Sequence, residues 1–69
     1  MKIVRLPFKV TEQYPETERG VKISRWLKEQ GLLMGRDYTW MVSTKDRELH
    51  FIFNGDAEAW ATMLTMKEL

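Results

Sequence analysis

The short length of the chain is what most limits its fold, because 69 residues can enclose only one hydrophobic core. A domain of this size buries only about 60% of the surface that its unfolded chain exposes, and many such domains depend on disulfides, a metal or self-association. The sequence has no cysteine and one histidine, His50, so it predicts neither a disulfide nor a histidine-rich metal site. We expect a single domain over residues 1–69, without metal or cofactor, stabilised by packing or by association.

The charge balance does not favour nucleic-acid binding. Eleven Lys and Arg oppose ten Asp and Glu, for a net charge of +1, whereas duplex-binding domains usually carry a clear basic excess. The start, MKIVRLPFKV, is too short and too charged for a signal peptide, and no apolar run approaches the ~20 residues of a membrane span. These features predict a cytoplasmic protein that does not enter a membrane.

Alternation of apolar and polar residues predicts a first strand over residues 2–10. Pro7 cannot donate a hydrogen bond to a neighbouring strand, so this strand should either lie at an edge of the sheet or carry a bulge. One side of the strand is apolar and the other carries the charges; the two sets are Val4, Leu6, Phe8 and Val10, and Ile3, Arg5 and Lys9.

Residues 37–43 and 48–53 are also typical of strands, and the polar residues 44–47 between them predict a hairpin turn. Pairing Trp40 with Phe51 brings the apolar side chains of both strands to one face. The pairs predicted on that face are Tyr38 with Phe53, Trp40 with Phe51, and Val42 with Leu49; Met41 pairs with His50 and Thr39 with Ile52 on the opposite face.

Two segments have helical spacing. The first runs from Pro15 to Gln30, where Pro15 suits the first position of a helix and Gly31 suits its left-handed end. Asp56 is predicted to cap a second helix that runs from Ala57 towards Leu69. The stripe predicted to face the sheet from the first helix is Gly20, Ile23, Trp26, Leu27 and Gln30, with Gly20 permitting a close approach.

The order strand, helix, strand, strand, helix predicts an α+β domain. A right-handed crossover places the first strand beside the third, which gives a three-stranded antiparallel sheet of order 1-3-2 with both helices on the aromatic face. This arrangement equals a ferredoxin-like unit that lacks its last strand.

The second predicted helix is more apolar than contact with one core requires. Trp60 and Leu64 centre on the core, and apolar residues then continue round one side of the helix as Ala59, Met63 and Met66. We call these three residues the methionine strip. Met-rich surfaces adapt to partners, so the strip predicts a protein interface, with burial in the core of a small domain as the other interpretation.

The connection over residues 31–36 is unusually apolar for a loop. Leu32 and Leu33 are predicted either to plug the end of the sheet or to contact another molecule, with the plug favoured. Together with the methionine strip, they complete the set of predicted partner-binding residues.

The face of the sheet opposite the aromatic residues offers an alternative function. Arg5, Lys9 and His50 on this face could contact a single-stranded nucleic acid weakly. Sheets that bind RNA stack bases on exposed aromatic rings, however, and the alternation places every strand aromatic on the covered face.

His50 is the only candidate for general acid–base catalysis. Ser43 and Glu48 are its polar neighbours in the predicted hairpin, and no oxyanion-hole or nucleophile-elbow pattern accompanies them. We therefore predict no enzyme activity and no catalytic residue, with His50 as a surface residue of the strand.

The last third of the chain consists of an aromatic strand, an acidic start of a helix and an amphipathic helix, in the run HFIFNGDA over residues 50–57 followed by Trp60 and Leu64. This pattern resembles the ending of many short phage-encoded proteins of unknown function, although residues 66–69 lack the aromatic residue expected there. The resemblance implies a small viral protein in the host cytoplasm that binds a host protein and inhibits or redirects it. The predicted function is thus a non-enzymatic interaction protein, either such a modulator or a homodimer.

Overall fold

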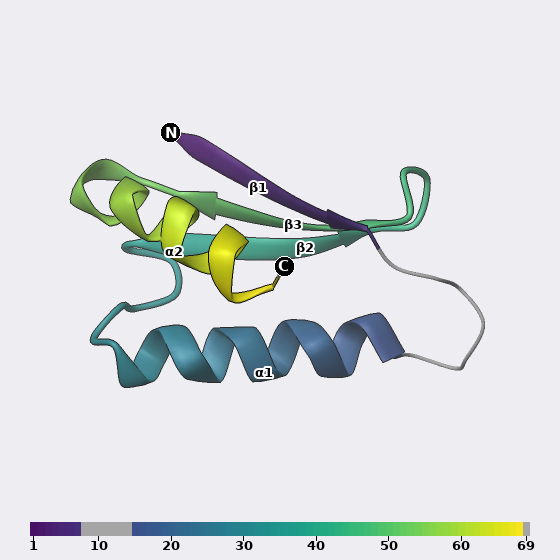
Figure 1. Ribbon diagram of the computed structural model, residues 1–69, viewed down its shortest axis with the longest axis horizontal. Helices are drawn as coiled ribbons and strands as arrows, with labels where there is room; N and C mark the ends of the chain where they lie inside the picture. The colour runs from purple at the N-terminus through teal and green to yellow at the C-terminus, as the bar shows by residue number, and fades with distance from the viewer. Residues whose placement is uncertain (8–14, 69) are drawn as a thin grey trace.

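The computed structural model describes residues 1–7 and 15–68 of the chain. The chain forms three strands and two α-helices in the predicted order, with a short 3-10 helix before the second α-helix, and their arrangement can be followed in Figure 1. The elements are β1 (Lys2–Pro7), α1 (Pro15–Glu29), β2 (Tyr38–Ser43), β3 (Glu48–Phe53), η1 (Gly55–Glu58) and α2 (Ala59–Lys67).

The strands form one antiparallel sheet of order β1-β3-β2, which confirms the predicted α+β topology. The register of the hairpin is also the predicted one, with Trp40 opposite Phe51 and Met41 opposite His50. β1 pairs with β3 as an edge strand and ends at Pro7, where a missing N–H costs no ladder bond inside the sheet. The predicted strand positions Phe8, Lys9 and Val10 lie outside the described residues.

The hydrophobic core lies on one face of this sheet. Each strand directs alternate side chains to that face, and both helices cover it, because α1 packs against β2 while α2 packs against β1 and β3. Phe51 and Phe53 on the central strand are fully buried, and each contributes roughly 1.5–3 kcal/mol by leaving water. The buried strand residues are Val4, Leu6, Tyr38, Leu49, Phe51 and Phe53.

Helix α1 packs against the Trp40 ring at Gly20. A Cβ atom at this position would lie 2.2 Å from Cζ3 of Trp40, so only glycine leaves room for the indole ring. Ile23 and Leu27 follow on the same stripe and are buried, whereas the predicted stripe member Gln30 is exposed because α1 ends at Glu29. The helix thus ends one residue before the predicted Gln30, and Gly31 after it has a φ of 91°, in the left-handed region as predicted.

The start of the second helix differs from the prediction. Asp56 does not cap a helix from Ala57; it lies inside the 3-10 helix η1, and α2 begins at Ala59. The reason is a tight turn after β3, in which the Ala57 N–H donates to the Asn54 carbonyl oxygen at 3.1 Å, a bond between residues three apart. α2 continues to Lys67, and the predicted end at Leu69 lies outside the described residues. Neither α-helix in the described part of the chain has the length and apolar character of a membrane span.

Candidate functional site

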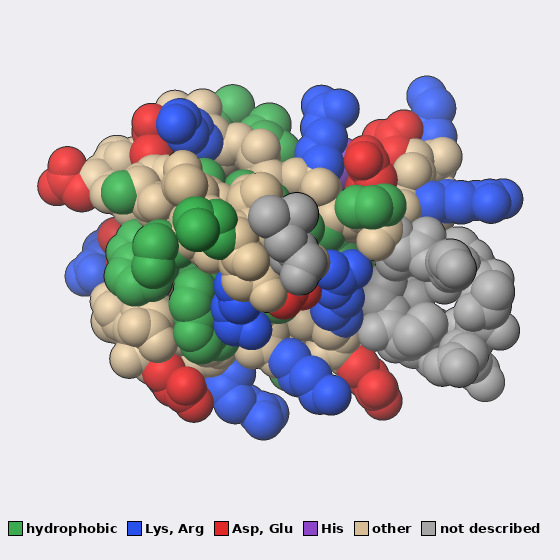
Figure 2. Space-filling model, in the orientation of Figure 1, with side chains coloured by type: hydrophobic (Ala, Val, Ile, Leu, Met, Phe, Trp, Pro, Cys, Tyr) green, Lys and Arg blue, Asp and Glu red, His purple; other side chains and the backbone are tan. Residues whose placement is uncertain are grey.

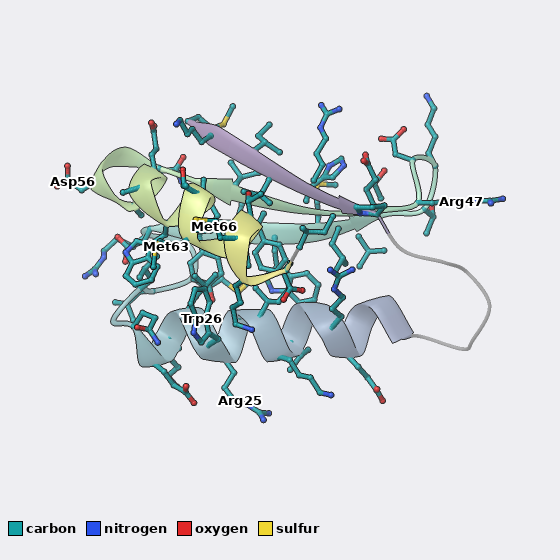
Figure 3. The ribbon with its side chains drawn as sticks, viewed as in Figure 1. Arg25, Trp26, Arg47, Asp56, Met63 and Met66 are labelled. Carbon is teal, nitrogen blue, oxygen red and sulfur yellow. The ribbon has the colours of Figure 1, made fainter. Side chains whose placement is uncertain are left out.

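The methionine strip lies on the solvent side of α2. Leu64 and Ala61 turn towards the sheet and are buried, and Trp60 packs against the core beside them. The strip residues remain outside, with Ala59 exposed, Met63 51% exposed and Met66 66% exposed. Figure 2 shows apolar side chains gathered over α2, where Figure 3 labels Met63 and Met66. A surface of this kind is suited to contact with another protein.

Contacts between the two α-helices give the strip a firm support. The indole rings of Trp26 and Trp60 meet edge to face, with centroids 5.7 Å apart and planes at 79°. The Lys67 ammonium lies 5.3 Å from the Trp26 ring, and the Arg19 guanidinium pairs with Glu68 at 2.9 Å. These contacts hold the end of α2 against α1, so the strip is presented on a fixed surface.

The apolar loop after α1 supplies one buried and two exposed side chains. Leu32 is buried in the core, which places it as a plug, while Leu33 is 49% exposed and Met34 is 58% exposed. The loop forms one end of a groove of about 580 Å³, which we call the β2 groove because that edge strand forms one wall. Its lining residues are Val21, Ser24, Arg25, Lys28, Leu32, Leu33, Met34, Tyr38 and Trp40.

The α1 wall of the β2 groove was not predicted from the sequence. Val21, Ser24, Arg25 and Lys28 are spaced as one face of a helix, a signal that could have identified them once β2 was placed beside α1. Within the groove, a hydrogen bond joins α1 to β2, because the Ser24 hydroxyl lies 2.5 Å from the Tyr38 hydroxyl.

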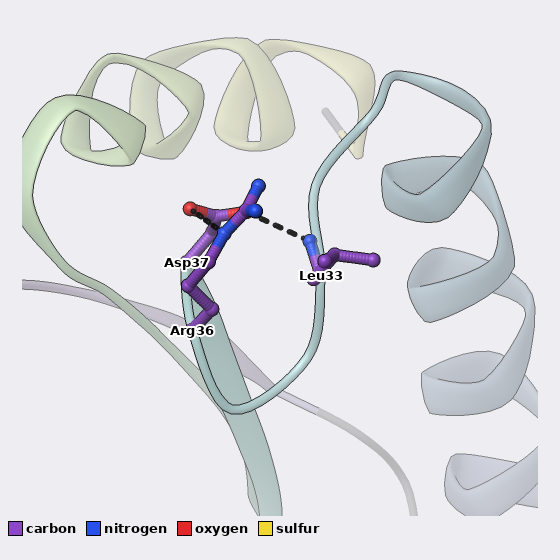
Figure 4. A network of polar contacts seen from close by, with 3 residues as sticks. All are labelled: Leu33, Arg36 and Asp37. Atoms are coloured by element: carbon purple, nitrogen blue, oxygen red, sulfur yellow. Dashed lines mark hydrogen bonds and ion pairs between the residues drawn. The ribbon is translucent and has the colours of Figure 1, made fainter.

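Polar contacts within the same loop hold the loop backbone in place beside the groove (Figure 4). The Arg36 guanidinium donates to both carboxylate oxygens of Asp37, and the Leu33 N–H donates to Asp37 Oδ2 at 2.8 Å. The Arg36 hydrogen bonds, followed by the Leu33 bond, hold the pKa of Asp37 below its usual range. The carboxylate is therefore ionised at neutral pH and ties Leu33 to the start of β2.

The open face of the sheet carries the residues predicted for nucleic-acid binding. Arg5 and His50 are paired across β1 and β3, with Arg5 exposed and His50 half-buried, while Lys9 lies outside the described residues. Trp40 and Phe51 stack with each other on the covered face, with ring centroids 5.8 Å apart and an angle of 10° between the ring planes. No described strand presents a Phe, Tyr or Trp ring to the open face, so among the described strands only the His50 imidazole could stack on a base there.

The polar groups near His50 are committed to local contacts. His50 Nε2 lies 3.2 Å from Glu48 Oε1, and the Ser43 hydroxyl donates to Asp46 Oδ2 at 3.1 Å instead of approaching the imidazole. Asp46, Glu48 and His50 place one ligating atom each within 4.8 Å of one another. This grouping was not predicted from the sequence, because the hairpin turn brings Asp46 back towards β3. Exposed carboxylates gather in turns without a cation as well, and we propose no metal site from this cluster.

We expect His50→Ala to change the free energy of unfolding by no more than about 0.5–1 kcal/mol, because a single partly buried pair with Glu48 on the open face of the sheet contributes little. Urea unfolding followed by circular dichroism measures this change. Loss of a biological activity in a variant that keeps its fold would contradict the prediction that His50 is a plain surface residue.

No family model, no curated protein and no solved structure matches this chain. The function must therefore be inferred from the two surfaces described above, the methionine strip and the β2 groove.

Proposed function

We propose that the chain is a non-enzymatic interaction protein that associates with a second copy of itself through the methionine strip. The observation that carries the proposal is the exposure of Met63 and Met66 on a helix that already packs its other side on the core. Burying both thioether side chains at an interface would contribute roughly 25 cal/mol for each Å² of apolar surface removed from water.

The composition of α2 adds to this support. Of its nine residues, Ala59–Lys67, only two threonines and one lysine are polar, so no broad hydrophilic face is left for solvent. A helix that is apolar on most sides is normally covered on most sides. In a chain without cysteine, self-association is a direct way to cover it.

The strip is complementary to itself in an antiparallel arrangement. Residues four and three apart lie on one side of a helix, so Ala59, Met63 and Met66 form a row that runs from a small to large side chains. If two such helices pack in opposite directions, Ala59 of one copy meets Met66 of the other and the two Met63 side chains meet near the centre. Small residues facing large ones fill an interface, and flexible methionines fill the remaining gaps.

A different protein is the competing occupant of the same strip. The predicted resemblance to phage-encoded proteins would make that occupant a host protein which the chain inhibits or redirects. A second copy is preferred because the self-complementary row of Ala59, Met63 and Met66 requires no further component.

We expect the double substitution Met63→Glu and Met66→Glu to abolish self-association while leaving the fold intact. Glutamate keeps helix propensity, and both positions are exposed, but four carboxylates would meet at the dimer interface. Sedimentation velocity should give twice the chain mass of 8.3 kDa for the native protein and 8.3 kDa for the variant.

The matched control is Thr44→Glu with Thr65→Glu, which adds the same two charges at exposed positions outside the strip. This control should sediment like the native protein. Assembly retained in a folded Met63→Glu and Met66→Glu variant would remove the strip as the interface. A native protein that remains a monomer would exclude the second copy as its occupant.

A further inference from the structure

We infer that the β2 groove binds an extended, acidic segment of another polypeptide, which adds as a fourth strand beside β2. The inference uses residues separate from the methionine strip and goes beyond self-association, so the failure of one proposal leaves the other standing. It follows from three features of the groove: open backbone groups, an apolar end and an excess of basic side chains.

β2 is an edge strand of the sheet, and its outer side faces away from β3. Just beyond the two strands, the Asn54 N–H donates to the Asp37 carbonyl oxygen at 2.9 Å, and this single bond sets the phase of the antiparallel ladder, although the Asp37 N–H donates to Leu33 instead. Such pairs alternate along a ladder, so Trp40 and Val42 direct their N–H and C=O groups away from β3. Among the described residues, only Tyr38 receives a bond from a loop on this side, from the Gly35 N–H at 2.7 Å. Trp40 and Val42 can therefore pair with a new strand.

The walls of the groove suit alternate side chains of such a strand. Those facing the helix side would enter between α1 and β2, where Val21, Leu33 and Trp40 supply apolar contact. Leu33 and Met34, which already stand exposed, lie at the loop end of the groove. This end of the groove therefore suits an aliphatic side chain of the bound segment.

The charged side chains that line the groove favour acidic residues in the rest of the bound segment. Arg25 and Lys28 line it from α1, and the other lining residues carry no carboxylate. Figure 3 shows Arg25 projecting from α1. The adjoining hollow adds Lys22 and contains one acid, Glu18, so the basic excess continues along the helix. Glutamate or aspartate side chains would meet these cations, which favours acidic partners over basic ones.

The test uses the peptide Ac-Thr-Leu-Thr-Glu-Thr-Glu-Thr-NH2, whose alternate residues place one Leu and two Glu on the same face. Titration into the ¹⁵N-labelled native chain should shift the amide signals of Trp40 and Val42. Replacing both Glu by Lys, or methylating the alternate peptide amides that would pair with β2, should each weaken binding at least tenfold. Absence of binding at millimolar peptide, or equal binding of the Lys peptide, would overturn the inference.

The chain itself offers a matched pair of variants. Arg25→Gln with Lys28→Gln should weaken binding of the acidic peptide at least tenfold, whereas Lys45→Gln with Arg47→Gln removes two exposed cations from the hairpin turn and should not. Undiminished binding by the Arg25→Gln and Lys28→Gln variant would contradict the site. Tighter binding of a seven-residue oligothymidine at Trp40 and Val42 would also contradict it, because that result would assign the groove to nucleic acid.

Discussion

Trp40→Ala is expected to lower the free energy of unfolding by about 3 kcal/mol, which is a large share for a domain whose stability is roughly 0.05–0.15 kcal/mol per residue. The indole ring stacks on Phe51 at 5.8 Å and packs over Gly20, so its removal leaves a cavity between α1 and the sheet. This loss is at the low end of the range usual for replacing a buried tryptophan by alanine, because the Trp40 ring also borders the β2 groove. Thermal and urea unfolding at one fixed protein concentration should show a melting temperature lower by more than about 10 °C.

Met41→Ala is the matched control for this experiment. Met41 is the next residue on the same strand, but it points to the open face and is 52% exposed. We expect a change within about 0.5 kcal/mol for this surface position. Similar losses in the two variants would show that the covered and open faces of the sheet are wrongly assigned.

Gly20→Ala should destabilise the protein, although alanine inside a helix usually gains about 1 kcal/mol over glycine. The new Cβ would clash with the Trp40 ring, which is also stacked on Phe51. Moving the ring away from the Cβ would disturb that stacking. We expect this overpacking to cost about 1–3 kcal/mol, measured by urea unfolding.

A double-mutant cycle separates this clash from other effects of the alanine. In a Trp40→Leu background the indole is gone, so Gly20→Ala should become neutral or stabilising, with a coupling energy of about 0.5–3 kcal/mol. Stabilisation of the native protein by Gly20→Ala alone would contradict the close contact.

Local patterns were sufficient to predict the sheet. Period-two alternation over 38–43 and 48–53, with four polar residues between them, determines which side chains share a face, and the register with Trp40 opposite Phe51 follows from it. Chain reversal and right-handed crossover then leave few topologies, so the order β1-β3-β2 could be predicted too.

The start of α2 could not be predicted in the same way. Asp56 has the chemistry of a cap, but the choice between a cap and a 3-10 turn depends on how the chain leaves β3 and where Ala57 becomes buried. The spacing within α1 likewise gives the buried stripe, yet its end at Glu29 leaves Gln30 in solvent.

The surfaces were predicted only in part. The strip residues Ala59, Met63 and Met66 could be identified because they lie outside the arc that one core needs. The β2 groove combines α1, a loop and an edge strand, and its walls are far apart in sequence, so spacing within any one element could not indicate it.

Isotope-filtered nuclear Overhauser spectroscopy on a mixture of labelled and unlabelled chains tests the central claim most directly. Self-association through the methionine strip predicts contacts between chains from the Met63 methyl to Met63 and from the Met66 methyl to Ala59. A sample in which the Met63 and Met66 methyl groups show contacts only within their own chain, at concentrations where the native fold is intact, would contradict the claim.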